Sequence, residues 1–181
     1  MAQARTRALY AELGVPDTPE GRFEMLALHL VLVLDRLGRT RGETGQTGQQ
    51  LARTLTETFA VDLDDNFREM SVGDLAVPGQ VRRAVGALHE RYSGYRAALA
   101  DPDDAPLTVA IQSRLAAVDA GQGLDARRIC AYIRLAKHRL DLEPAAEVLA
   151  GRIVWPHIDA AERDTEARGG SSADDGGEHA R

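Results

Sequence analysis

An acidic cluster within residues 61–77 contains the residue types and spacings that come nearest to a chemical site. The stretch reads VDLDDNFREMSVGDLAV, in which Arg68 is the one base. The acidic residues are Asp62, Asp64, Asp65 and Glu69, followed by Asp74 after a break at Gly73. A calcium loop starting at Asp62 would need glycine in place of Phe67 and glutamate in place of Gly73. The sequence therefore predicts no calcium loop.

The adjacent pair Asp64 and Asp65 also fails the pattern of a magnesium site. The aspartate motif of all-helical isoprenoid enzymes needs a third aspartate where Arg68 stands, and usually a second copy elsewhere, and the chain has neither. We predict no metal site, and two interpretations of the cluster stay open. In one, its helix face contacts a charged partner. In the other, Arg68 and Asp74 tie the end of the helix to the turn at residues 14–18.

His29 lies in the most apolar segment of the chain, residues 25–34. It is either a haem or metal ligand or a buried neutral histidine bonded to a backbone or carboxylate group, and the second interpretation is favoured. No Glu-x-x-His pair is present to form a di-iron site. Cys130 and the serines have no base at a recognisable spacing, and no glycine-rich phosphate loop occurs. The sequence thus predicts a protein that is not an enzyme and has no cofactor.

The composition is that of one globular domain. The chain has 181 residues, 44% of them hydrophobic and 4% aromatic, so its core must consist mainly of Leu, Val, Ile and Ala. A net charge of -6 argues against a surface that coats nucleic acid. A single cysteine fits a reducing compartment. The longest apolar run is shorter than the roughly 20 residues of a membrane-spanning helix, so we expect a soluble protein.

Capping signals and helical periodicity run through most of the chain. Thr18 is expected to cap a helix that starts at Pro19 and ends near Leu37. The residues with a predicted structural role in turns are Gly14, Pro16, Asp17, Thr18 and Gly73. Apolar residues spaced by four and then three form one face from Leu51 to Met70, so the acidic cluster is predicted to be helical.

A second apolar face is expected on the helix that follows Pro78. It consists of Val81, Val85, Leu88, Tyr92, Tyr95 and Leu99. Tyr92 and Tyr95 are interpreted as core residues, with contact to an apolar peptide segment as the alternative. No stretch alternates with the period of a strand. The prediction is an all-α protein, a single bundle of six or seven helices over residues 1–158 with a polar loop at 38–45 and a disordered acidic tail at 159–181.

Two strings of the sequence are long and specific. Residues 10–37 read YAELGVPDTPEGRFEMLALHLVLVLDRL, and residues 62–77 read DLDDNFREMSVGDLAV. With the tyrosine-bearing helix after them, they closely resemble the ubiquinol–cytochrome c chaperone family, most strongly from about Tyr10 to Leu99. Of a Phe-Tyr-Gly-Arg string common in that family, this chain keeps only Arg91, within the string LHER.

The resemblance implies a non-enzymatic role in the assembly of respiratory complex III. Mitochondrial members of the family bind newly made cytochrome b, and they associate with the ribosome exit region through a small partner subunit. A bacterial member is expected to bind cytochrome b or another complex III subunit in the cytoplasm, without direct reading of nucleic acid. Peripheral association with the inner membrane is a second option. The residues proposed for partner contact are Asp62, Asp64, Asp65, Arg68, Glu69, Asp74, Tyr92 and Tyr95.

Two other classes of function stay open from the residues alone. One is a generic helical adaptor or scaffold without a membrane-protein client. The other is a haem- or isoprenoid-handling protein that uses His29 or the aspartates. Haem absorbance and metal analysis would test the second class, and capture of cytochrome b from solubilised membranes would separate the adaptor from the chaperone.

Overall fold

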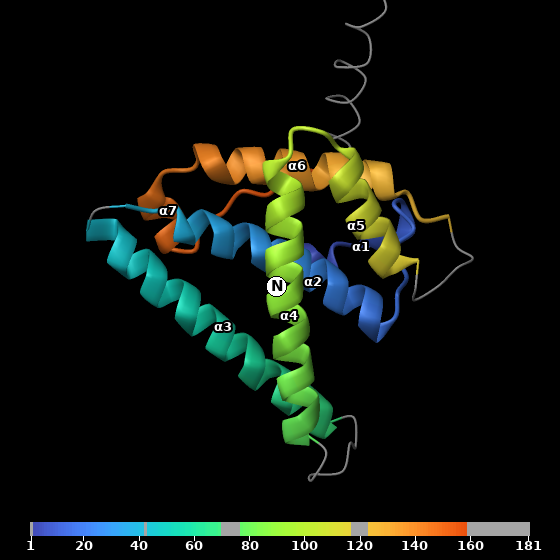
Figure 1. Ribbon diagram of the computed structural model, residues 1–181, viewed down its shortest axis with the longest axis horizontal. Helices are drawn as coiled ribbons and strands as arrows, with labels where there is room; N and C mark the ends of the chain where they lie inside the picture. Colours follow the sequence, from blue (N-terminus) through green and yellow to red (C-terminus); the bar gives the residue numbers. More distant parts are fainter. Residues whose placement is uncertain (1, 42, 70–76, 117–122, 159–181) are drawn as a thin grey trace, which may run out of the picture.

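The computed structural model describes residues 2–41, 43–69, 77–116 and 123–158 (Figure 1). In these residues the chain forms seven α-helices, one short 3-10 helix and no strand. In chain order the elements are η1 (Gln3–Arg5), α1 (Arg7–Ala11), α2 (Pro19–Gly38), α3 (Glu43–Glu69), α4 (Val77–Ala100), α5 (Ala105–Leu115), α6 (Ala126–Leu142) and α7 (Ala145–Leu149). The all-α prediction is therefore confirmed. The predicted tail at residues 159–181 lies outside the described residues.

The central helix of the bundle is α2, which contacts η1, α3, α4, α5 and α6. It begins as predicted, because the Thr18 hydroxyl accepts a hydrogen bond from the backbone N–H of Gly21 at 3.1 Å and Pro19 is the first helical residue. Six of the eight residues from Met25 to Leu32 are buried, His29 included, and Leu26 and Leu30 are half-buried. A helix with apolar residues almost all round is expected to lie inside the molecule, and this one does.

The link between α2 and α3 is shorter than the predicted loop at residues 38–45. The Thr40 hydroxyl donates a hydrogen bond to the Leu37 carbonyl at 2.6 Å, which satisfies one of the free acceptors at the end of α2. Gly45 and Gly48 then pack closely on Thr40, because they have no side chain to keep the backbones apart. These contacts let α3 begin at Glu43, within the region predicted to be a loop.

The main core lies among the N-terminal segment, α2, the last turns of α4, α5 and α6. Its fully buried large side chains include Leu9, Leu13, Met25, Leu28, Ile111, Ile129, Tyr132 and Ile133. Polar side chains reinforce the same contacts: Arg36 on α2 donates hydrogen bonds to the carbonyls of Leu140 and Glu143, both at 2.8 Å, and so caps the end of α6. Arg134 on α6 likewise holds the loop between α4 and α5 through the carbonyls of Asp101 and Asp103.

The long helix α3 and the first part of α4 pack on α2 outside the main core. Figure 1 shows α3 diverging from α2 toward the start of α4, which crosses α2 on its way to α5. A small cluster of three buried residues joins the three helices: Ala27 on α2, Phe59 on α3 and Leu88 on α4. The sequence left open whether the acidic stretch belongs to one long helix or to two with a break near Val61, and α3 is one helix of 27 residues.

The turn between α1 and α2 depends on Gly14, and this predicts a stability effect. Gly14 has a φ of 67°, and a Cβ there would lie 2.5 Å from the carbonyl oxygen of Gly123. Gly14→Ala is therefore expected to lower the free energy of unfolding by about 2–4 kcal/mol, from left-handed strain together with the clash. Gly86 on α4 has no atom within 4 Å of such a Cβ, so the control Gly86→Ala should stabilise by about 0.5–1 kcal/mol. Urea unfolding of the two variants checks the opposite signs.

Candidate functional site

The candidate site is the angle between α2, α3 and α4, where apolar side chains are incompletely covered. One face of α2 carries Phe23, Leu26 and Leu30, all half-buried and packed on the small cluster. On α3, Leu51 and Leu55 are half-buried as well. Their spacings of three and four place each set on one side of its helix. The two helices therefore leave an apolar surface that neither of them fully buries.

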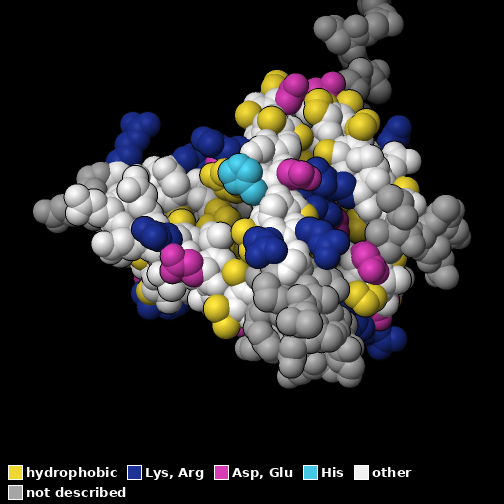
Figure 2. Space-filling view, turned by 60° about the horizontal axis from the view of Figure 1, so that its bottom comes forward, with side chains coloured by type: hydrophobic (Ala, Val, Ile, Leu, Met, Phe, Trp, Pro, Cys, Tyr) yellow, Lys and Arg dark blue, Asp and Glu magenta, His cyan; other side chains and the backbone are white. Residues whose placement is uncertain are grey.

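Figure 2 shows hydrophobic side chains in the angle between α3, at the left, and α4, at the centre, with Lys or Arg side chains on both sides. The exposed arginines of α4 are Arg82, Arg83 and Arg96. Of these, Arg96 lies 3.3 Å from the carboxylate of Asp35 on α2, which also binds Arg39 at 3.0 Å. The surface around the apolar angle is thus charged, and part of that charge links α2 to α4.

A buried polar cluster fixes α2 against α4 beside this angle. The carboxylate of Glu24, whose side chain is 3% exposed, accepts hydrogen bonds from Arg91 Nε at 2.7 Å and from the Tyr95 hydroxyl at 2.6 Å. The Arg91 guanidinium also lies over the Phe23 ring, 5.0 Å from its centroid. Burial and the Glu24 carboxylate raise the pKa of the Tyr95 phenol. The phenol therefore stays protonated and can donate its hydrogen bond to Glu24.

The two tyrosines proposed for partner contact differ in their exposure. Tyr95 is 1% exposed and belongs to the main core, which agrees with its interpretation as a core residue. Tyr92 is half-buried, and the Arg96 guanidinium lies 6.0 Å from its ring centroid. Of the two rings, only that of Tyr92 has surface left for contact with a partner.

The acidic cluster is only partly described. α3 continues as a helix to Glu69, as predicted, and Asp62 is half-buried on it. The side chains of Asp64, Asp65, Arg68 and Glu69 lie outside the described residues, as do Gly73 and Asp74. The ion pair expected between Asp64 and Arg68 stays a prediction for the same reason. In the part of the chain that the structure describes, no group of three or more His, Cys, Asp or Glu could hold a metal ion.

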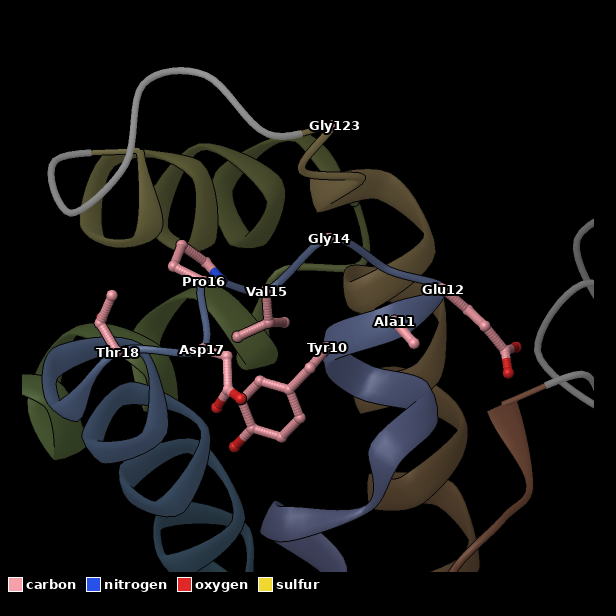
Figure 3. Close-up of a pocket in the computed structure, with 9 residues that line it drawn as sticks. All are labelled: Tyr10, Ala11, Glu12, Gly14, Val15, Pro16, Asp17, Thr18 and Gly123. Carbon is pink, nitrogen blue, oxygen red and sulfur yellow. The ribbon is translucent and has the colours of Figure 1, made fainter.

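Four of the five turn residues predicted from the sequence, all except Gly73, line an open pocket of about 600 Å³. Its walls are residues 10–12 of α1 and its end, residues 14–18 of the turn, and Gly123. Figure 3 shows the Tyr10 and Asp17 side chains close together, whereas Glu12 points away from them. Asp17 already binds Arg22 at 2.7 Å, which lowers its pKa. The polar groups of these residues do not converge on one point, and their structural role stays a prediction.

His29 forms a closed hydrogen-bond chain in the core. Its Nδ1–H donates to the Met25 carbonyl at 2.7 Å, and Nε2 accepts from the Tyr132 hydroxyl at 2.8 Å, which in turn accepts from Gln3 at 3.0 Å. The Trp155 ring packs edge-on against the imidazole, with centroids 5.0 Å apart. Burial lowers the pKa of His29 to about 4. Both ring nitrogens are used, so His29 is the buried neutral histidine favoured from the sequence, with a tyrosine in place of a carboxylate.

Sequence reasoning missed the polar residues that hold the helices together. Glu24, Asp35 and Tyr132 were not singled out, and Arg91 was noted only for the string around it. The available signal was a charged residue inside the apolar face of a helix, because Glu24 and Asp35 lie among positions that become buried. Such a residue needs a partner, but its position does not say which helix supplies that partner.

Comparison with known proteins adds three findings. The family model described as ubiquinol-cytochrome C chaperone matches residues 11–155 of the chain. Curated proteins gave no match. Among solved structures, the chain is similar to the Cbp3 homolog from Brucella abortus, with 30% sequence identity and a TM-score of 0.75. That match covers 87% of this chain and 84% of the Brucella chain.

Proposed function

The chain belongs to the ubiquinol-cytochrome C chaperone family, and on this premise we propose that it binds and stabilises newly made cytochrome b during assembly of respiratory complex III. The observation that carries the proposal is the family match over residues 11–155, which includes the helices from α2 to α7. The role needs no reaction: it needs a rigid bundle with a surface for an immature membrane subunit.

We propose the angle between α2, α3 and α4 as the surface that receives this client. Phe23, Leu26 and Leu30 supply incompletely buried apolar area, which an apolar client segment could cover. Tyr92, half-buried on α4 and four residues after Leu88, adds an aromatic ring that a client could contact. An assembly partner that completes this burial would gain free energy from area that α3 alone leaves in water.

The acidic part of α3 is proposed to contact basic loops of the client. Membrane proteins carry an excess of lysine and arginine in their cytoplasmic loops. The end of α3 has Glu57 and Asp62 among the described side chains, and its sequence continues with Asp64, Asp65 and Glu69. No helix in the described ranges is long and apolar enough to cross a bilayer. We therefore propose that the protein works at the cytoplasmic side of the inner membrane, with which it associates peripherally.

The test is capture of cytochrome b from membranes solubilised in mild detergent. The double variant Asp65→Lys/Glu69→Lys should capture about tenfold less cytochrome b than the wild type, because each exposed charge contact contributes up to about 1 kcal/mol and reversal turns attraction into repulsion. Circular dichroism should show unchanged helicity.

The matched control is Glu12→Lys/Glu20→Lys, which changes the net charge equally at two exposed acids distant from α3 in sequence. It should capture cytochrome b like the wild type. Equal losses in both double variants would mean that only net charge matters and would remove the acidic cluster from the site. Absence of cytochrome b from wild-type captures would leave the generic adaptor as the function.

A further inference from the structure

We propose that α3 is a displaceable cover over the apolar face of α2, and that an apolar helix of the client takes its place. The inference rests on the proposed function for the identity of the client. It deepens that function by naming the element that moves and the residues that become free: Phe23, Leu26 and Leu30 on α2 and Leu88 on α4.

The polar contacts of α3 differ from those of the other long helices. Between residues 45 and 61, the described side chains of α3 make ion pairs and hydrogen bonds only within the helix, as between Arg53 and Glu57 at 3.0 Å. By contrast, α2 is bonded to α4 through Glu24 and to α6 through Arg36. Opening of α3 along this stretch therefore breaks no side-chain hydrogen bond or ion pair to another element.

In its described part, α3 also has few large apolar side chains that are fully buried. Between residues 45 and 61, Phe59 is the one large side chain that is buried, at 4% exposed. Its ring packs on Phe23, with centroids 5.9 Å apart, and in the same cluster as Ala27 and Leu88. The main core has many more buried residues, and none of them belongs to the part of α3 whose side chains the structure describes. Elements with little buried apolar surface open at lower free energy than the global unfolding of a protein.

The N-terminal end of α3 supplies the pivot. A Cβ on Gly48 would lie 2.2 Å from Thr40 Oγ1 and 2.9 Å from the Leu37 carbonyl, so this end of α3 touches the end of α2 directly. Leu51, Leu55 and Phe59 lie progressively farther along α3 from this contact. A rotation about Gly48 would thus separate Phe59 from Phe23 while the first turns stay in place.

The chemistry of α3 defines what can replace it. It presents Leu51, Leu55 and Phe59 at intervals of four, which is the pattern of an amphipathic helix lying in a groove. A helix that is apolar all round, as in a membrane protein before insertion, satisfies the same requirement. The occupant we infer is therefore one apolar helix of the client, bound where α3 packs in the closed state.

Hydrogen exchange of the purified wild-type chain tests the cover without any client. Amides in residues 45–61 should exchange at least about 100-fold faster than those of residues 25–34 in α2, and with one common opening rate. Equal protection of α3 and α2 would overturn the inference.

A labelled peptide of residues 43–69 serves as the probe for the opened face. Phe59→Ala in the full chain weakens the cover and should raise peptide affinity by about tenfold, since more of the chain is open. Leu30→Gln loosens the same contact from the other side but damages the face that receives the peptide, so it should lower the affinity below wild type. A peptide that carries Phe59→Ala itself should bind more weakly to every chain.

A peptide affinity that both full-chain variants raise equally would indicate binding to loosened chains in general and would overturn the inference, as would no binding to either. These measurements contain no cytochrome b, so their failure is distinct from failure of the capture experiment. The cover can be absent in a genuine chaperone, and it can be present in a chain that captures no cytochrome b.

Discussion

Arg91→Met should lower the free energy of unfolding by about 3–5 kcal/mol, because it leaves a buried carboxylate without its counter-charge. The Glu24 side chain is 3% exposed and that of Arg91 is 17% exposed, so water cannot replace the lost guanidinium. The Tyr95 hydroxyl would remain as a donor to Glu24 Oε1. Urea unfolding followed by circular dichroism measures the loss.

The double variant Glu24→Met/Arg91→Met tests whether the loss of stability comes from the unpaired carboxylate rather than from removal of the Arg91 side chain. Replacing both charges by apolar groups of similar length removes the unpaired carboxylate, so the double variant should be more stable than Arg91→Met alone. Arg82→Met, at an exposed arginine on the same helix, should change stability by less than about 0.5 kcal/mol. Losses that simply add in the double variant would show that Glu24 and Arg91 do not act as a pair.

The contact between Glu24 and Arg91 is also an example of what the sequence does not predict. Local signals were sufficient for α2: the Thr18 cap, Pro19 at the first position and the apolar segment after it all act within a few residues. Glu24 and Arg91 are 67 positions apart, and His29 and Tyr132 are 103 apart. A partner on another helix depends on how the helices pack, and periodicity does not contain that information.

At the candidate site too, the sequence predicts the local helix face but not how that face packs. The spacing of Leu51, Leu55 and Phe59 predicts a face on α3, and that face exists. The spacing does not say that Leu51 and Leu55 stay half-buried, because exposure depends on how far α3 diverges from α2. The loop predicted at residues 38–45 was too long for a related reason: its glycines make a close helix contact, which the sequence alone cannot distinguish from a flexible turn.

Lowering the pH from 7 toward 4 should cost the wild type about 3 kcal/mol of stability through His29 alone. Burial lowers the pKa of this imidazole from 6.5 to about 4. The unfolded chain takes up the proton below pH 6.5, whereas the folded chain does so only near pH 4. The contribution is therefore fully present above pH 6.5 and is lost as the pH falls through this window. Chemical unfolding at closely spaced pH values measures it.

A variant without a titrating group at this position isolates the effect from that of the carboxylates, which also lose stability in acid. His29→Gln should be less stable than the wild type at pH 7, since its amide does not reproduce both hydrogen bonds to Met25 and Tyr132. The difference between the two chains should shrink steadily toward pH 4. His138→Gln, at an exposed histidine on α6, should follow the wild-type profile. A constant difference between the wild type and His29→Gln across this range would mean that His29 has the same pKa in the folded and the unfolded chain, which would contradict its burial as a neutral imidazole.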